Sequence, residues 1–437
     1  MKTHHEALAR TTLLLNREFF SGEADERVLA DALIATTVRL QADEASLTSR
    51  AGQAAFVTAF LLTARLGIGI ELDAPNVPVI DRVAPLRVRL LVDALLELGG
   101  DLVPNALVRT TAGEVDETFS FGDRESQADG SIVRVSVTDF SAEVSRNLER
   151  STCIGDIPLG GFAAGAAIAV IALEAAMPRF QAATGLQVRH PRPSPGPPLK
   201  IDLRDLFPEI DARPDPDLGA VDAISGGAIT HALIYCLLRV PGLRVRLRVI
   251  EEQDAELSNV NRYQLLRASD DGRVKVEQLE EAVSSIVRIT GKPVSFTKDT
   301  RDDLLPLAPR VVVGVDDVRA RWWVQEENPA WLAIGATGTH LAQLTTHQLG
   351  TACAGCAHPV PLDPQTIPTI SFVSFWAGLL QACALLSRTP PVGRNVVVYP
   401  FALGGAPTSS FELVPSPACP INCPASTEAG VPRIFVK

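Results

Sequence analysis

A proline-rich segment near the middle of the sequence divides the chain into two parts of similar length. His190 to Pro198 carries five prolines in nine residues, and such a stretch cannot form a helix or a central strand because proline lacks the backbone N–H that both need. We therefore expect a first domain over residues 1–190, a linker over residues 191–200 and a second domain over residues 201–437. A chain of 437 residues has room for two or three domains.

Both parts open with the same order of elements, which indicates an internal repeat. Apolar runs and helical spacing predict a strand, a helix and a strand at 37–41, 52–66 and 68–72, and again at 220–224, 227–239 and 243–250. Strand–helix–strand units of this kind build parallel sheets.

Later elements extend the same pattern. An Ala-rich helix is predicted late in each part, at 161–176 and at 375–386. The second part also predicts a helix at 276–290 and strands at 294–297, 311–315 and 331–334. The sequence therefore predicts an α/β fold with two tandem doubly wound, Rossmann-like domains.

One predicted strand departs from the expected pattern. Leu243 to Val249 alternates arginine with apolar residues, whereas a strand of a covered parallel sheet is apolar on both faces. The alternation suggests an edge strand or a surface that faces a partner.

Composition excludes several classes of function. The formal net charge is −11 and the sequence pI is about 5.2, so a nucleic-acid binder is not expected. The longest apolar stretch, Ile157 to Leu173, contains Pro158 and is mostly Ala and Gly, which favours a buried helix over a membrane span. The N-terminal residues lack the features of a secretory signal, and we expect a cytoplasmic protein.

Four of the seven cysteines form two close pairs. Cys353 and Cys356 flank two residues, Cys419 and Cys423 flank three, and 62 residues separate the pairs. Four thiolates at this spacing suit tetrahedral zinc in a closed structural site, which leaves no open position for catalysis. The alternative is two unrelated pairs of buried thiols.

A series of residues in the second part has the chemistry of a nucleotide site. Gly226 and Gly227 follow a predicted strand and open a helix, where free amides hold phosphate oxygens. The next predicted strand ends at Glu251, which can accept hydrogen bonds from ribose hydroxyls. Arg262 and Lys275 can place two cations over a triphosphate.

A carboxylate pair completes this series. Asp316 and Asp317 follow the predicted strand at 311–315, a position where Mg²⁺ bound to phosphates is commonly held. Arg321, one helical turn further on, can orient that loop. Each of these residues alone would be read as a solvated surface charge, and their order along the chain favours a nucleotide site.

These motifs resemble a known superfamily. They are similar to those of the ThiF-like superfamily, which contains ubiquitin-activating enzymes and the adenylyltransferases of thiamine and molybdopterin synthesis. The motifs that carry the resemblance are the run Glu256-Leu-Ser-Asn-Val-Asn-Arg262, then Gly272 and Lys275, then Asp316 to Arg321, and the two cysteine pairs. The match covers about residues 220–425. Its members use ATP and Mg²⁺ to adenylate the C-terminal glycine of a ubiquitin-like or sulfur-carrier protein.

The resemblance implies roles for individual residues. It makes Glu251 the ribose contact, with Gln253 in the same motif at the strand end. Asn259, Arg262 and Lys275 would contact the nucleotide phosphates. Asp316 would be the Mg²⁺ ligand. Arg262, Lys275 and Asp316, with a possible Arg17, would then carry the catalytic charge.

The first part is similar to the same superfamily in a different way. Leu15-Asn-Arg17-Glu18 looks like the Tyr-x-Arg-Gln segment whose arginine reaches the γ-phosphate of ATP held by a partner subunit, which gives Arg17 a role toward the second part. The first part has no Gly-Gly loop and no Asn-Arg pair after Asp73. The resemblance therefore implies an inactive adenylation domain fused to an active one, a pseudo-dimer within one chain.

Some positions differ from the superfamily pattern. The glycine loop keeps only its central pair, and residues 357–368, the crossover in which thioester-forming members carry a cysteine, contain none. Either the enzyme stops at the adenylate or the thiol lies elsewhere. Cys153 stands at the equivalent place in the first part, and we interpret it as a buried structural residue.

The expected function is activation of the C-terminal glycine of a bacterial ubiquitin-like protein, of the kind met in antiphage defence, with transfer to a conjugating-type enzyme as a further step. Three alternatives remain at this point. The chain could stop at the adenylate of a sulfur-carrier protein or a modified peptide, it could be a scaffold that docks a carrier protein without catalysis, or it could be an NAD(P)-dependent dehydrogenase, which the absence of Gly-x-Gly-x-x-Gly disfavours.

Overall fold

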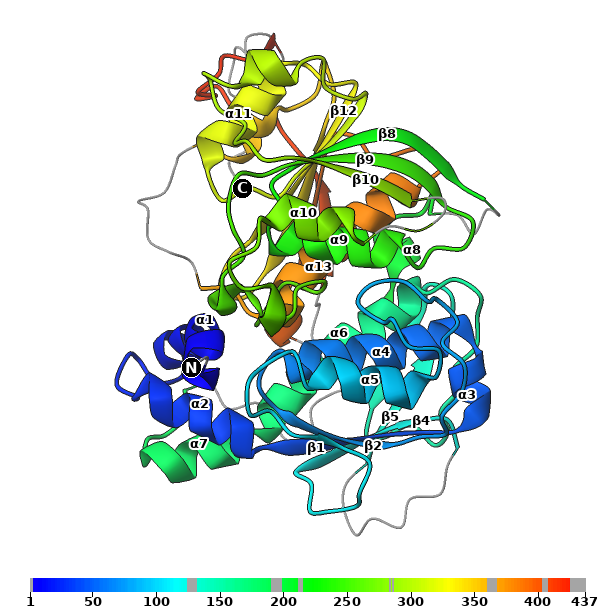
Figure 1. Ribbon diagram of the computed structural model, residues 1–437. Coiled ribbons are helices and arrows are strands. Elements are labelled where there is room, and N and C mark those ends of the chain that lie inside the picture. Colours follow the sequence, from blue (N-terminus) through cyan, green and yellow to red (C-terminus); the bar gives the residue numbers. More distant parts are fainter. Residues whose placement is uncertain are drawn as a thin grey trace, which may run out of the picture.

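Two mixed sheets, each mainly parallel, organise the chain. The computed structural model describes residues 3–123, 132–189, 199–210, 215–282, 284, 287–359, 368–402 and 408–424. Within these residues, strands β1 to β7 form the first sheet and strands β8 to β15 form the second. Figure 1 shows the two sheets at opposite ends of the molecule with helices between them.

The first sheet has the order β3-β2-β1-β4-β5-β6-β7. Strands β1 to β5 pair in parallel, and β6 and β7 add antiparallel pairs. Its strands are β1 Thr37–Ala42, β2 Gly69–Asp73, β3 Val108–Arg109, β4 Glu117–Phe121, β5 Ile132–Val137, β6 Ser141–Ser145 and β7 Leu199–Asp202. Its helices are α1 His4–Phe19, α2 Glu26–Ala35, α3 Glu44–Thr48, α4 Arg50–Ala64, α5 Leu91–Gly99, α6 Leu159–Ala175, α7 Met177–Thr184 and α8 Leu203–Leu206.

The second sheet repeats this order as β10-β9-β8-β11-β12-β13-β14-β15. Its strands are β8 Asp217–Ile224, β9 Arg244–Ile250, β10 Val287–Lys292, β11 Arg310–Val313, β12 Trp331–Thr337, β13 Ala342–His347, β14 Arg394–Val398 and β15 Thr408–Glu412. Its helices are α9 Ala228–Leu237, α10 Lys275–Glu280, α11 Val318–Glu326, α12 Ala354–Ala357 and α13 Ser371–Leu386, with short 3-10 helices η1 Leu257–Asn259, η2 Ala268–Asp270, η3 Arg301–Leu304 and η4 Pro400–Ala402. Both sheets place their first five strands in the same order, so the predicted repeat of two α/β units is present.

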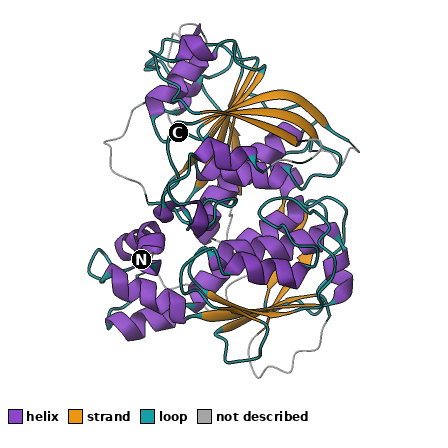
Figure 2. Cartoon of the chain, in the orientation of Figure 1, coloured by secondary structure: helices purple, strands orange, loops and turns teal. Residues whose placement is uncertain are grey.

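The helices between the sheets join the two halves into one core. Figure 2 shows this helical layer between the two sets of strands. The ring of Phe162 in α6 lies 6.3 Å from that of Phe375 in α13, and Thr58 Oγ1 in α4 lies 3.0 Å from Tyr235 Oη in α9. A single cluster of buried apolar residues runs through both halves. The halves therefore stabilise each other through burial of apolar surface.

Small residues let α4 and α6 approach closely. A Cβ on Gly161 would lie 2.2 Å from the carbonyl oxygen of Ala51, and one on Gly165 would lie 2.5 Å from Cβ of Thr58. Only glycine fits at these contacts, which explains the Gly and Ala content of α6. Residues 159–184 form a helical segment long and apolar enough to cross a membrane, but 83% of its most apolar window is buried inside the protein.

The boundary between the halves differs from the predicted one. Residues 191–198 of the predicted linker lie outside the described residues, but Leu199–Asp202 forms β7, which pairs with β6. The first sheet therefore continues past the proline-rich segment. A strand of four residues is too short to show an alternating pattern of its own.

The region after Lys275 was also predicted wrongly. The predicted helix at 276–290 ends at Glu280, and residues 287–292 form β10 in parallel register with β9. Residues 294–297, which were predicted to form a strand, form none and follow just after the end of β10. Val287 and Ile289 bury one face of the strand, and their alternation was masked by apolar residues that also fit helical spacing.

The arginine-rich strand is not an edge strand. β9 lies between β8 and β10, so the predicted edge position was wrong. Val245, Leu247 and Val249 are buried, while Arg244 and Arg246 on the opposite face are exposed. The alternation arises because one face of this interior strand is open to solvent.

Candidate active site

The turn after β8 binds the Glu251 carboxylate through Ser225 and Gly226. Ser225 has a positive φ of 93°, and Gly227 is the N-cap of α9. The backbone N–H of Gly226 donates to Glu251 Oε2 at 3.0 Å, and the Ser225 hydroxyl donates to the same oxygen at 3.3 Å. A Cβ on Gly226 would lie 3.0 Å from the Glu251 side chain. The turn and the carboxyl end of β9 are therefore in close contact.

Glu251 is connected to Lys275 through Gln253. The backbone N–H of Gln253 donates to Glu251 Oε1 at 2.9 Å, and Lys275 Nζ donates to Gln253 Oε1 at 2.8 Å. Lys275 is only 3% exposed, and burial lowers the pKa of its amine. The Glu251 carboxylate retains lone pairs for further donors such as hydroxyl groups.

The segment that contains Asn259 and Arg262 is rigid. Asn259 Oδ1 accepts from the backbone N–H of Glu256 at 3.1 Å within a reciprocal capping arrangement around η1. Arg262 Nη1 donates to the carbonyl of Ser258 at 2.7 Å and to Asn261 Oδ1 at 2.8 Å. Burial lowers the pKa of Arg262. These bonds hold one face of the guanidinium and fix its direction.

Tyr263 lies at the centre of the predicted nucleotide residues. Its ring centre is 5.3 Å from Arg262 Cζ and 5.5 Å from Lys275 Nζ. Burial raises the pKa of its hydroxyl to about 12, and the carboxylates of Glu251 and Asp316 also act on it. The fold therefore brings residues that follow β9, η1 and β11, together with Lys275 of α10, near one aromatic side chain.

Sequence reasoning missed Tyr263. Its hydroxyl oxygen lies 3.8 Å from the position of a Cβ on Gly227, beside the Ser225 hydroxyl. A single aromatic residue after Arg262 gave no periodic or charged signal that distinguishes it from a core residue. Its position beside the glycine turn shows that it lines the same site.

Asp316 stands on a loop that neighbouring residues fix. Asp317 Oδ1 accepts from the backbone N–H of Arg319 at 2.9 Å as the N-cap of α11, while Asp316 is exposed. Arg321 donates to the carbonyl of Val315 from Nε at 3.1 Å and from Nη2 at 2.8 Å. Burial lowers the pKa of Arg321, and both carboxylates counteract this. Arg321 thus holds the Val315 carbonyl at the start of this loop.

Helix α1 of the first half reaches the site of the second half. Asn261 Nδ2 donates to Thr11 Oγ1 of α1 at 2.8 Å, and Asn261 Oδ1 holds Arg262. Arg10 is one of the charges that act on Arg262. Arg17, which was predicted to act toward this site, lies two turns further along α1 in its last turn and is exposed. Arg10 was missed because it precedes the motif that singled out Arg17.

A buried arginine of the first half holds the loop that follows Arg262. Arg65, directly after α4, is fully buried. It donates to the carbonyls of Gln264 and Leu266 at 3.0 and 2.7 Å, and also to the carbonyl of Val260. Burial lowers the pKa of this guanidinium. The loop that carries Arg262 and Tyr263 is thus fixed by the other half of the chain.

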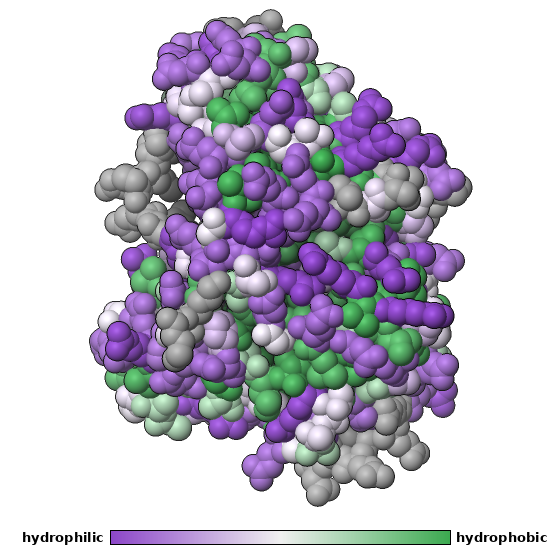
Figure 3. Space-filling model, in the orientation of Figure 1, coloured by the Kyte–Doolittle hydropathy of each residue, from purple (hydrophilic) through white to green (hydrophobic). Residues whose placement is uncertain are grey.

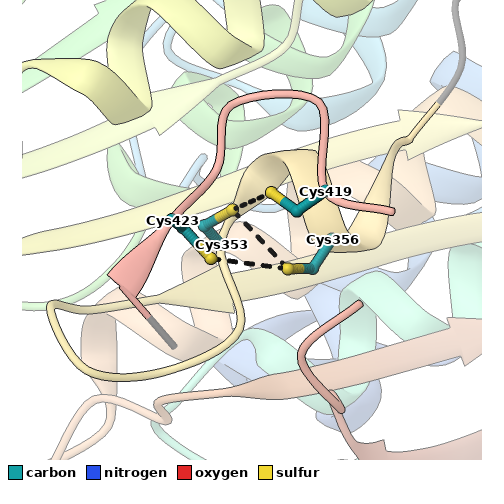
Figure 4. A group of neighbouring side chains, drawn as sticks. All are labelled: Cys353, Cys356, Cys419 and Cys423. Atoms are coloured by element: carbon teal, nitrogen blue, oxygen red, sulfur yellow. Dashed lines mark hydrogen bonds between the residues drawn. The ribbon is translucent and has the colours of Figure 1, made fainter. Parts of the chain in front are cut away.

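The four paired cysteines converge on one point. Cys353 Sγ lies 3.4 Å from Cys419 Sγ and 3.7 Å from Cys356 Sγ, and Cys356 Sγ lies 3.6 Å from Cys423 Sγ. Figure 4 shows the four side chains pointing toward one another from α12 and from the C-terminal turn. Tetrahedral zinc with Zn–S bonds of about 2.3 Å separates its sulfurs by about 3.8 Å. Burial raises the thiol pKa values of Cys353 and Cys356, and this donor set fits a tetrahedral metal ion.

Cys153 lies elsewhere and is buried. It is 4% exposed, and its thiol donates to the carbonyl of Val135 at 3.4 Å. Burial raises the pKa of this thiol to about 12. A buried thiol of this kind is a poor nucleophile.

Native Cys153 is expected to resist alkylation by iodoacetamide at pH 8. At a pKa near 12 only about one thiol in ten thousand is ionised at this pH, against roughly one in five for an unfolded cysteine. Site-resolved mass spectrometry should show labelling at least about a hundredfold slower in the native protein than in guanidinium. Labelling of native Cys153 at the unfolded rate would show that this thiol is accessible and activated.

Comparison with known proteins gives a family match within the first half. The family described as the BilD N-terminal domain matches residues 37–184, which span the first half from β1 to the end of α7. An uncharacterised protein, y4jF, from Sinorhizobium fredii is 30% identical over 154 residues, which are 34% of this chain and 30% of that protein. The chain thus spans less than a third of the length of this relative.

Several solved structures are similar to part of this chain. Escherichia coli MccB with succinimide has 17% identity and a TM-score of 0.40. The match covers 46% of this chain and 66% of the MccB chain. MccB with AMPCPP and MccA has 18% identity, the same coverage and a TM-score of 0.40. PaaA has 13% identity and a TM-score of 0.36, and covers 45% of this chain and 64% of its own.

Proposed function

We propose that this chain is an ATP- and Mg²⁺-dependent adenylyltransferase that activates the C-terminal carboxylate of a protein substrate. One observation carries the proposal: Glu251, Arg262, Lys275 and Asp316, from four separate segments, surround Tyr263 beside the glycine turn. Two cations, a ribose acceptor and an exposed carboxylate are the groups that ATP with Mg²⁺ requires.

The proposed adenylation needs little acid–base catalysis by side chains. The substrate carboxylate is already ionised, so the protein has to hold it in line with the α-phosphate and neutralise charge on the departing pyrophosphate. Arg262 and Lys275 supply fixed positive charge, and Asp316 would hold Mg²⁺, which adds further positive charge when bound. Tyr263 Oη, beside Gly227, is placed to donate to a phosphate oxygen.

The proposed substrate is a ubiquitin-like protein that ends in glycine. The resemblance of residues 256–321 and of the cysteine pairs to activating enzymes supports this choice, and the first half supplies α1 to the site as an inactive partner domain would. The first half is a seven-stranded α/β unit, which disfavours a small peptide-clamping domain in its place. We propose that the reaction ends at the adenylate unless a thiol outside the crossover accepts the product.

The crossover itself gives no structural support for a thioester step. Residues 357–368 contain no cysteine in the sequence, and residues 360–367 lie outside the described part of the chain. A conjugating-type enzyme as partner therefore stays a proposal that depends on a thiol elsewhere.

A scaffold without catalysis is the second candidate, and one observation favours it. The Gly226 N–H, which a phosphate would need, already donates to Glu251 Oε2. ATP binding requires this bond to be exchanged for one to phosphate, whereas a scaffold could keep it.

Calorimetric titration with ATP, with and without Mg²⁺, distinguishes these functions. We expect the wild-type protein to bind Mg²⁺-ATP and Asp316→Asn to bind it about tenfold more weakly, with little change for ATP in EDTA, because the substitution removes a metal ligand. Asp302→Asn, an exposed carboxylate on η3, is the matched control. Absence of ATP binding by the wild-type protein would favour the scaffold, and pyrophosphate exchange with a glycine-terminated ubiquitin-like protein tests the substrate.

We further propose that the cysteine cluster holds structural zinc. The purified protein is expected to contain about one zinc per chain, and Cys419→Ser should lose it and lower the unfolding temperature by about 3–6 °C. Metal analysis and calorimetry measure both effects. Cys383→Ala, which removes a buried thiol of α13, should retain the metal, and a metal-free wild-type protein of unchanged stability would show two unrelated thiol pairs.

A further inference from the structure

The open face of the second sheet carries a set of positive charges that the proposed site does not use. Arg244, Arg246 and Arg248 of β9 share one face, and Arg288 and Lys292 of β10 lie on the same face because Arg288 is in register with Arg246. We call these five residues the arginine face. The apolar residues between them point into the core shared with α9 and α10.

Only part of this charge is neutralised on the strands. Arg244 pairs with Asp217 at 3.2 Å, and Arg248 pairs with Asp222 at 2.8 Å. Within the described residues, Arg246, Arg288 and Lys292 have no carboxylate within 4 Å.

The two central arginines, Arg246 and Arg288, are direct neighbours on β9 and β10, and Asp217, the partner of Arg244, also acts on Arg246. Arg246 is flanked in register by Arg288 on β10 and by Ala220 on β8. Like charges directly beside each other on neighbouring strands destabilise a sheet. The fold retains this cost in two exposed side chains.

In the first sheet, the arginines at the equivalent place pair with one buried carboxylate. There Arg39 of β1 donates to Glu71 of β2 at 2.6 Å, and Arg109 of β3 donates to the same carboxylate at 3.3 Å. The backbone N–H of Gly113 also donates to Glu71 at 2.8 Å, and Glu71 is 2% exposed. The first-sheet arginines are thus paired, as Arg248 is with Asp222 and with the carbonyl of Pro306, whereas Arg246 and Arg288 of the arginine face are exposed and lack such a pair within the described residues.

Figure 3 shows strongly hydrophilic side chains gathered on the surface over β8, β9 and β10. A local excess of positive charge on a chain whose formal net charge is −11 will attract an anionic partner. Asp217 is exposed on the same face and disfavours a continuous phosphate backbone, whereas Asp222 is buried against Arg248. Discrete carboxylates on a protein surface can pair with Arg246 and Arg288 and avoid Asp217.

We propose that the arginine face is a docking surface for an acidic protein partner. Arg246 and Arg288 form its centre, and Lys292, which lies beside Ile250 and Glu251 at the carboxyl end of the sheet, marks its border with the candidate active site. Arg244 and Arg246 lie toward the amino end of β9, whereas the candidate active site lies at its carboxyl end. The partner would therefore dock without blocking the nucleotide residues.

Fluorescence anisotropy with a labelled oligoglutamate peptide tests this surface. We expect the wild-type protein to bind the peptide at low salt, and Arg246→Glu with Arg288→Glu to weaken binding at least about tenfold. The control is Arg27→Glu with Arg89→Glu, which changes net charge equally at exposed arginines elsewhere and should change affinity less than about twofold. Equal losses in both double variants, or no binding by the wild-type protein, would overturn the proposal.

Two further measurements test whether the arginine face binds RNA instead and whether its arginines serve only the stability of the fold. An oligouridylate RNA that binds more tightly than the peptide, with the same dependence on Arg246 and Arg288, would overturn the protein partner. Arg246→Gln with Arg288→Gln should raise the unfolding temperature, because it removes the repulsion between the two arginines. A lower unfolding temperature would show that the arginines serve the fold and would count against a docking role.

Discussion

Arg262→Ala is expected to slow ATP–pyrophosphate exchange by a factor of about 10²–10³ while leaving the fold intact. The guanidinium is held by Ser258 and Asn261 and stands beside Tyr263, so it offers a fixed charge to the departing pyrophosphate. Removing one fixed donor from a developing charge costs about 3–4 kcal/mol of transition-state stabilisation. Exchange at saturating ATP measures the effect.

Arg262→Lys is the matched control for charge. Lysine keeps the positive charge, but its single ammonium nitrogen cannot both replace Nη1 as the donor to Ser258 and Asn261 and offer the remaining N–H groups of the guanidinium to a phosphate, so an intermediate rate is expected. Both variants should retain the wild-type circular dichroism and unfolding temperature to within a few degrees. An unchanged exchange rate in Arg262→Ala would remove Arg262 from the proposed catalytic groups without excluding ATP binding.

Arg65→Met is expected to lower the free energy of unfolding by about 3–5 kcal/mol. Arg65 has no exposed surface and donates to three carbonyls of the loop at 260–266. Methionine fills a similar volume but leaves these carbonyls buried without donors. Urea unfolding followed by circular dichroism measures the change.

Arg50→Met provides a comparison at a pair that is partly open to solvent. Arg50 pairs with Asp81, and the two side chains are 24% and 21% exposed. Its loss should cost about 1 kcal/mol. If Arg65→Met were no more destabilising than Arg50→Met, the contact between the halves would not depend on this arginine.

The sequence predicted the elements whose signals are local. Long apolar runs such as 311–315 and Ala-rich stretches such as 161–176 carry their own pattern, and both appear in the structure as β11 and α6. Strand β10 was missed because its place is decided by register with β9. Strand β7 was missed because four residues after a proline-rich segment gain their structure only from pairing with β6.

The candidate site could be predicted only for residues with a charged or glycine motif. The predicted nucleotide residues Glu251, Arg262, Lys275 and Asp316 lie around one point, while their roles stay proposals. Arg65 could not be found, because an arginine after a helix resembles a surface residue and its acceptor Val260 is 195 positions away. Contacts between residues so far apart in the sequence cannot be predicted from the local composition.

The contact between α1 and the loop of Arg262 has a consequence for how the protein behaves on dilution. When two separate subunits complete one site, their encounter depends on concentration, and activity per molecule falls below the dissociation constant. Here one polypeptide carries both halves, so the effective concentration of α1 at the loop is set by the chain itself. The specific activity of the proposed adenylyltransferase should therefore stay constant on dilution, and a variant first half introduced on another molecule should be unable to exchange into the site.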